Sequence, residues 1–437
     1  MALSRRDLIG TGVAAAAATT MGSAQPGAPG AEPSQGLPLA FDATDPNLKF
    51  DLLVTGGTVV DPSQKMHARR DVAIKNGQIA ALAEGIAPGR ATQVFDAAGA
   101  IVTPGLVDLH CHYYHQVSGI GLPADEMMGL TATTTGVDAG DAGYASFPGF
   151  RHHVMGQSRT RLFAFIHISS IGLAGNPIKV GELLNIDYAD VDACAKAVAE
   201  NRDVCLGVKV RMSKNVVGSN GMEPLRRALR AAQLAGPWAR VMCHIGDAPV
   251  PLGEVLDALR PGDIITHTYS NAGQVNAIVA GGKLLPQALE ARRRGVIFDV
   301  GHGGGSFDFT IAAPALEQGL APDTISSDVH SVSIQSPGKP LLPWVLSKFL
   351  TLGMTLDQVI AKATVEPARI VGRVPGLGTL QIGAPADVAV FRLVEGPVTF
   401  VDTNKHERRG TAYLDPVKTI RQGRPFGFPF PDPFTFT

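Results

Sequence analysis

The segment Ile101-Val-Thr-Pro-Gly-Leu-Val-Asp-Leu-His-Cys-His112 decides the fold of this 437-residue chain. It is a nearly continuous apolar run that ends in two histidines. Continuous apolar runs are typical of parallel strands that are covered on both faces. The alternative to a closed barrel is an open doubly wound sheet, which would carry a glycine-rich phosphate loop after its first strand. This strand ends in His-Cys-His instead, so the segment favours the barrel.

Seven further runs of the same kind follow along the chain. Helical patterns separate several of them, over residues 191–201, 223–234, 252–259 and 285–294. Eight strands with intervening helices predict an α/β fold, a (β/α)8 TIM barrel over residues 101–375. The eight expected strands are 101–112, 131–139, 161–169, 204–211, 240–246, 263–270, 296–302 and 324–330.

Short strands with polar faces flank the barrel on both sides. Residues 51–60 and 71–80 have the pattern of hairpins, and residues 386–391 and 417–423 have the pattern of strands. Each flank has too few strands to be stable alone. The sequence therefore predicts one small β-sandwich, built from residues 48–100 and 376–437 together.

The first residues have the pattern of an export signal. Arg5-Arg6 precedes a weakly apolar Ala/Thr/Gly run and then small residues up to Ala24. This order resembles a twin-arginine (Tat) signal over residues 1–24, and the alternative is a disordered cytosolic tail. Residues 25–47, rich in Pro, Gly and Ala, are predicted to be a linker. The protein is expected in the periplasm or outside the cell, without a lipid or membrane anchor.

Replacing Arg5 and Arg6 together with lysine is expected to retain the precursor in the cytoplasm, because the export receptor reads the twin arginines. Immunoblots of cytoplasmic and periplasmic fractions measure the result against the wild-type chain. An unchanged amount of periplasmic protein in the double variant would argue against the signal.

Composition excludes several classes of protein. The chain has 38 Lys and Arg against 39 Asp and Glu, a net charge of −1, and no basic run exceeds Arg292–Arg294. A nucleic-acid partner is therefore not expected. Four cysteines in a chain of this length do not make a disulfide framework. No strongly apolar stretch reaches the roughly 18 residues that a membrane span needs. The expected partner is a small molecule, and self-association into a homo-oligomer stays open.

Metal-binding side chains stand at the ends of the expected strands. His110 and His112, two apart on a strand, point to one face and can reach one metal ion. Lys209 lies inside a buried apolar strand, where an ammonium is costly unless it is neutralised, paired or modified. Three more such residues close other strands at the barrel end where active sites form: His244, His267 and Asp328.

These residues, in this strand order, resemble the amidohydrolase superfamily, in its binuclear branch with a carboxylated lysine. The segments Gly207-Val-Lys-Val-Arg-Met-Ser213, Asp299-Val-Gly-His-Gly-Gly304 and Ser326-Ser-Asp-Val-His330 are most similar to the amidohydrolase/deacetylase subgroup, near the dihydroorotases. The resemblance covers residues 50–425. It implies a metal site made of His110, His112, Lys209, His244, His267 and Asp328.

The same resemblance implies two divalent metal ions, with zinc expected, and a carbamate formed on Lys209 from carbon dioxide. A buried neutral lysine can add carbon dioxide and so become an anion between two cations. The ions would hold a bridging hydroxide that attacks the substrate, with Asp328 as the catalytic acid and base.

Parity along the strands predicts which side chains lie near the substrate. Tyr114 shares the parity of His112, Arg211 shares that of Lys209, and His302 belongs to the seventh strand. All three are expected near the substrate, with Arg211 suited to a carboxylate. The cysteines at 111 and 243 have the opposite parity and are expected to pack outward.

The expected function is hydrolysis of an amide in N-acylated amino acids, with related esters as further substrates. Dihydroorotases carry an arginine where this chain has Tyr114, which weakens the first alternative, a cyclic-amide hydrolase. D-aminoacylases carry a metal-binding cysteine on the second strand, which residues 131–138 lack. The second alternative is a non-catalytic exported binding protein, and the full set of metal-site residues argues against it.

Overall fold

The computed structural model describes residues 37–176, 178–271 and 277–427. The predicted signal peptide, residues 1–24, lies outside the described residues, as do residues 25–36 of the predicted linker and residues 428–437. Among the helices of the described part, none has both the length and the apolar character that crossing a membrane requires.

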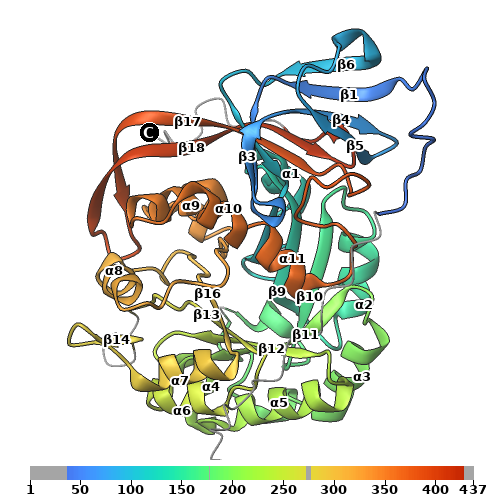
Figure 1. The fold of residues 1–437 in the computed structure, drawn as a ribbon. Coiled ribbons are helices and arrows are strands. Elements are labelled where there is room, and N and C mark those ends of the chain that lie inside the picture. The colour runs from blue at the N-terminus through green and yellow to red at the C-terminus, as the bar shows by residue number, and fades with distance from the viewer. Residues whose placement is uncertain (1–36, 177, 272–276, 428–437) are drawn as a thin grey trace, which may run out of the picture. The chain divides into compact units, whose positions relative to one another are not determined.

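A strongly curled sheet of seven parallel strands forms the centre of the α/β fold (Figure 1). Its order, β16-β13-β12-β11-β10-β9-β8, follows the chain, and among the described strands only the short separate hairpin of β14 (Val279–Ala280) and β15 (Lys283–Leu284) comes between β13 and β16 in the sequence. Two isolated parallel bridges, Cys111 with Val329 and Asp299 with Thr324, join segment 324–329 to both edge strands. The strands are β8 (Leu106–Cys111), β9 (Thr133–Gly143), β10 (Arg161–His167), β11 (Cys205–Met212), β12 (Arg240–Ile245), β13 (Ile264–Thr266) and β16 (Ile297–Asp299).

Helices pack against the outer face of this sheet and share one large core with the outward strand residues. Cys111 and Cys243 belong to that core as free, buried cysteines, as their parity predicted. Four helices lie where they were expected: α3 (Val191–Glu200), α5 (Glu223–Ala235), α6 (Leu252–Ala258) and α7 (Pro286–Arg294). The others described are α1 (Ala124–Leu130), α2 (Phe147–Gly149), α4 (Lys214–Val217), α8 (Phe309–Glu317), α9 (Leu342–Thr351), α10 (Leu356–Lys362) and α11 (Val365–Val371).

Two further sheets come from the flanks of the chain. One, ordered β5-β4-β1-β6, uses N-terminal strands alone, whereas β19-β18-β17-β7-β2-β3 combines both flanks. The sheets share a buried apolar cluster that includes Val54, Ile74 and Val390. Their strands are β1 (Phe50–Thr55), β2 (Thr58–Asp61), β3 (Met66–Arg69), β4 (Asp71–Lys75), β5 (Gln78–Ala83), β6 (Ala91–Asp96), β7 (Ile101–Pro104), β17 (Val388–Val401), β18 (Glu407–Arg421) and β19 (Arg424–Pro425).

The run 101–112 is not one strand, as the sequence suggested, but two. It divides at Gly105 into β7, which pairs with β17, and β8 of the curled sheet. A Cβ at Gly105 would lie 2.4 Å from Thr134 Oγ1, so only glycine fits this close approach. The strands β17 and β18 are also longer than expected, because their hairpin continues along α9 (Figure 1).

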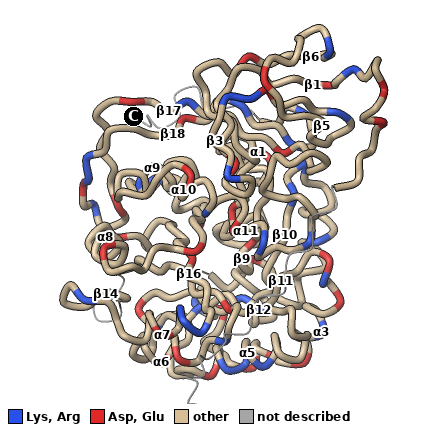
Figure 2. The backbone as a smooth tube through the Cα atoms, in the orientation of Figure 1, with Lys and Arg blue, Asp and Glu red and all other residues tan. Residues whose placement is uncertain are grey.

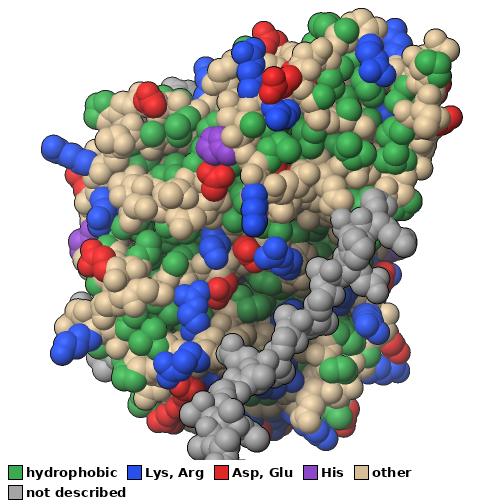
Figure 3. Space-filling view, viewed as in Figure 1, with side chains coloured by type: hydrophobic (Ala, Val, Ile, Leu, Met, Phe, Trp, Pro, Cys, Tyr) green, Lys and Arg blue, Asp and Glu red, His purple; other side chains and the backbone are tan. Residues whose placement is uncertain are grey.

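Charged side chains of both signs are interspersed along the backbone (Figure 2). On the face drawn in Figure 3, lysines and arginines lie among acidic and apolar side chains rather than in one basic patch of the described residues. The surface visible there is therefore mixed in charge, as the balanced composition suggests.

Candidate metal centre and its pocket

A pocket of about 480 Å³ opens at the ends of the parallel strands. Four of the residues expected at a metal site line it, from strands β11 and β12 and from the segments after β8 and β16: His112, Lys209, His244 and Asp328. Arg211 and His330 add further polar groups, and Ile120, Leu173 and Val332 add apolar surface.

The carboxylate of Asp328 lies at the centre of this group. Its Oδ1 is 3.0 Å from His112 Nε2 and 3.3 Å from His110 Nε2. Lys209 Nζ is 3.2 Å from the same His110 nitrogen. All four side chains are buried. The ligand atoms of His110, His112 and Asp328 lie within 4.8 Å of one another, a spacing compatible with one metal ion.

Hydrogen bonds behind the two strand-β8 histidines fix which nitrogen faces the site. The hydroxyl of Thr266 donates to Asp299 Oδ2, so its oxygen accepts from His110 Nδ1 at 2.8 Å. Asp141 Oδ1 accepts from His112 Nδ1 at 2.7 Å. Each Nδ1 therefore carries a hydrogen, and in a neutral ring each Nε2 presents a lone pair to the site.

His244 and His267 form a second pair beside the first. His267 Nδ1 donates to the carbonyl of Gly301 at 2.6 Å, and its Nε2 lies 2.7 Å from His244 Nδ1. The rings of His267 and His110 are 5.0 Å apart. His267 and Asp328 both have positive φ angles, 69° and 49°. Such backbone strain in residues other than glycine persists where the surrounding structure enforces it, often at functional sites.

The electrostatics of the site separate its members. Burial lowers the pKa of His267 to about 4 and that of Lys209 to about 8, so a neutral amine is accessible near physiological pH. Burial opposes ionisation of Asp328, but His110, His112 and His267 outweigh it and hold its pKa well below the usual range. Burial disfavours the charged form of His112, but Asp141 and Asp328 outweigh this effect. The net result is a His112 pKa raised to about 10.

These groups fit a divalent metal ion. Two imidazole lone pairs that face a carboxylate oxygen at 3.0 and 3.3 Å repel it unless a positive charge lies between them. Without a metal ion, a proton on His112, whose pKa is raised to about 10, supplies this positive charge. Imidazole and carboxylate donors suit zinc, and also manganese or cobalt.

The structure brings Arg211 into the pocket but leaves out Tyr114 and His302. The chain turns away after Cys111, so Tyr114 packs against Phe150, with ring centroids 4.9 Å apart. His302 was expected on the seventh strand, but β16 ends at Asp299, and glycines with positive φ at positions 301 and 303 turn the chain on either side of His302. His302 is instead fully buried, with Nδ1 on the Gly303 carbonyl and Nε2 at 2.7 Å from Lys348 Nζ.

Sequence reasoning missed the residues that stand behind the histidines. Asp141 and Asp299 both lie in buried strands, where a carboxylate is costly unless it has partners, and this is a usable sequence signal. Glu182, whose Oε1 accepts from Arg211 Nη1 at 2.6 Å, lies in a loop without a recognisable pattern.

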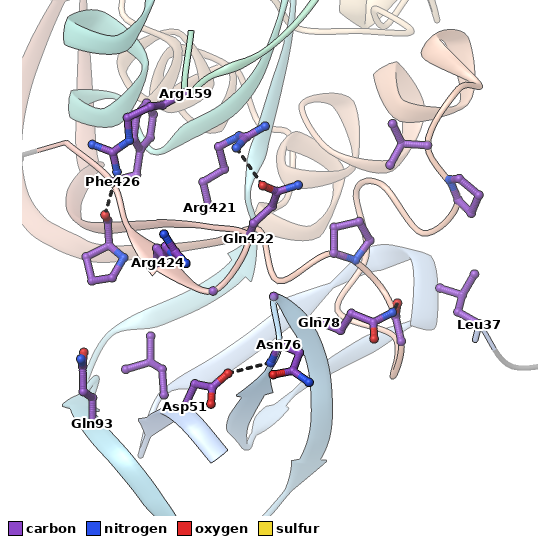
Figure 4. Close-up of a pocket in the computed structure, with 18 of the residues that line it drawn as sticks. Leu37, Asp51, Asn76, Gln78, Gln93, Arg159, Arg421, Gln422, Arg424 and Phe426 are labelled. Carbon is purple, nitrogen blue, oxygen red and sulfur yellow. Dashed lines mark hydrogen bonds between the residues drawn. The ribbon is translucent and has the colours of Figure 1, made fainter. Parts of the chain in front are cut away.

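A larger cavity of about 1260 Å³ lies elsewhere, between the flanking strands and the segment around β19 (Figure 4). Arg159, Arg421 and Arg424 line one side of it, and Asp51 and Asn76 line the other. Its described lining contains neither histidine nor cysteine, unlike that of the pocket at the strand ends.

Comparison with known proteins places the chain. No family model matches its sequence. A deacetylase from Agrobacterium fabrum is 35% identical over 341 residues, which cover 78% of this chain and 82% of that protein. A crystal structure of a dihydroorotase matches with a TM-score of 0.79 and 32% identity over 86% of this chain and 98% of its own. A crystal structure of an adenine deaminase matches with a TM-score of 0.78 and 30% identity, over 87% of this chain and 100% of its own. On this evidence the chain belongs to the amidohydrolase superfamily.

Proposed function

We propose that this protein is a metal-dependent deacylase that hydrolyses the amide bond of N-acylated amino acids, and related esters. The observation that carries the proposal is the buried group His110, His112 and Asp328 at the floor of a pocket. The similarity of the chain to a deacetylase, over most of both chains, supports the removal of an acyl group from the substrate. The substrate is a small molecule, because the pocket holds about 480 Å³.

We also propose that the curled sheet closes into a (β/α)8 barrel. Segment 324–329 bridges both edge strands of the curled sheet and acts as its eighth strand, so that Asp328 faces strand β8. The two flanking sheets form the β-sandwich, since they share one apolar cluster. We also propose export by the Tat route, which rests on Arg5-Arg6, the weakly apolar run that follows and the small residues up to Ala24.

We propose that the six residues hold two divalent ions, zinc first among them. His110, His112 and Asp328 would hold one ion, His244 and His267 would hold the other, and Lys209, as a carbamate, would supply an anionic ligand. When bound, such ions polarise a carbonyl and make water acidic enough to ionise near neutral pH.

The chain's own residues orient the reaction and move its proton. The hydrogen bonds at Nδ1 of His110, His112 and His267 fix the direction of the three rings. Asp328 is ionised and can take a proton from water at one carboxylate oxygen, then deliver it to the leaving amine. Gly303 gives this carboxylate room, because a Cβ there would lie 2.3 Å from Asp328 Oδ2.

The test combines metal analysis with a substrate screen. The purified protein is expected to carry two divalent ions per chain and to hydrolyse N-acetyl amino acids and their ester analogues. Dialysis against a chelator is the control, and it should abolish turnover that added zinc restores. Activity on dihydroorotate alone would instead support a cyclic-amide hydrolase, which the dihydroorotase similarity keeps as the second candidate.

A further inference from the structure

Glu182 is a buried carboxylate beside the pocket. It lies in the loop between β10 and α3, and its exposed fraction is 2%. Its Oε1 accepts a hydrogen bond of 2.6 Å from Arg211 Nη1. The loop is held in place nearby, because Asn220 Nδ2 donates to the carbonyls of Leu183 and Leu184. Glu182 is therefore fixed by its backbone and can in turn fix Arg211.

Arg211 faces the place where a substrate would lie. It lines the pocket and stands opposite His244 in the register of β11 and β12. Its guanidinium has five N–H donors, and among the described residues only Glu182 accepts a hydrogen bond from it. An end-on bond through one nitrogen leaves the remaining donors for another acceptor. A planar fork of donors matches a carboxylate.

Two buried atoms around this pair lack partners within the described chain: Glu182 Oε2 and His167 Nε2. His167 pairs with Lys209 in the register of β10 and β11, and its Nδ1 accepts from the backbone N–H of Ser169. Its Nε2 therefore carries the hydrogen and is a free donor, whereas Glu182 Oε2 is a free acceptor. Buried polar atoms without partners mark places where water or a ligand group belongs.

We propose that Glu182 is the positioning residue that presents the Arg211 guanidinium to the carboxylate of the substrate. This inference rests on the proposed deacylase function and adds its selectivity for free acids. Pinning a long, flexible side chain before binding reduces the conformational entropy that binding would otherwise cost. Ile120, Leu173 and Val332 line the same pocket, so an apolar substituent beside the carboxylate fits.

The test compares racemic N-acetyl-phenylalanine with its carboxamide, which differ only in the charged group. The wild-type, metal-loaded enzyme is expected to prefer the acid by about a hundredfold in kcat/KM, the effect of one or two charge-assisted hydrogen bonds. Glu182→Gln, which keeps size and removes the charge, should lower this preference about tenfold. The loss should appear in KM for the acid rather than in kcat. If Glu182 had a structural role alone, the variant would lower kcat/KM equally for the acid and for the carboxamide.

A matched control is Glu223→Gln, which removes the same charge from an exposed ion pair with Arg227 on α5. It should leave the preference unchanged. Arg211→Lys keeps the charge but not the fork, should also lower the preference, and serves if Glu182→Gln does not fold. A wild-type enzyme that favours the carboxamide, or a Glu182→Gln variant that matches the control, overturns the proposal. If neither compound is hydrolysed, the proposed function fails, and the ratio of their Kd values tests Arg211 and Glu182 in the same way.

Discussion

Lys209→Ala is expected to lose bound metal and to lower the rate of hydrolysis about 10⁴-fold or more. This is a large part of the rate enhancement of an enzyme over the uncatalysed reaction. Lys209 Nζ lies 3.2 Å from His110 Nε2, and burial brings its pKa to about 8. A neutral amine in this position can become the carbamate that links two ions, whereas alanine offers no ligand atom. Metal per chain, measured by elemental analysis, should fall together with activity.

The matched control is Lys196→Ala, because the Lys196 side chain is 74% exposed and pairs loosely with Glu200 on α3. It should keep metal and activity. Short carboxylic acids, supplied with bicarbonate, are expected to restore part of the activity of Lys209→Ala by filling the vacated space. A ¹³C signal from labelled bicarbonate should appear on the wild type and not on the variant. Full metal and full activity in Lys209→Ala would remove the carbamate from the mechanism.

Asp328→Asn is expected to keep most of its metal and to lower kcat by about 10²–10⁴-fold, the usual contribution of general acid–base catalysis. Asparagine has the same size and retains an oxygen ligand, but it cannot hold the proton that passes from water to the leaving amine. His110, His112 and His267 keep the wild-type pKa of Asp328 low, so the residue starts the cycle as a base.

Two substrates separate this role from simple damage to the site. An activated ester has a leaving group that needs no proton, so its hydrolysis should suffer less than that of an amide. Both assays are made on variant protein whose metal content equals that of the wild type. Amide turnover at the wild-type rate would show that another group carries the proton, and His330 at the rim of the pocket would be tested next.

Periodicity predicted the parts of the fold in which one segment decides its own structure. Buried parallel strands read as continuous apolar runs, so β9 to β13 were expected close to where they lie. The division of 101–112 at Gly105 depends on Thr134 and β17, which are distant in sequence. The full length of β17 and β18 depends on packing along α9. Neither of these long-range contacts changes the local hydrophobic pattern of the sequence, so neither could be predicted from it.

The candidate site shows the same limit. Residues such as His244 and His267 could be found because each closes an apolar run of its own, but parity fails once the backbone leaves the strand. Tyr114 and His302 follow such departures, and neither lines the pocket. The supporting carboxylates Asp141 and Glu182 act through contacts between separate segments, which only the folded chain reveals.

The pairing of β7 with β17 has a consequence for the order in which the chain folds. Pro104 lies opposite Val388, so this sheet joins residues from near both ends of the chain. A growing chain must wait for nearly its whole length before Val102 is covered by Val390. Loop closure over such a separation is slow, and the apolar face stays exposed to other chains meanwhile. A truncated chain that ends before β17 would leave the apolar face of β7 uncovered and prone to aggregation. Only chains synthesised past β17 can bury this face.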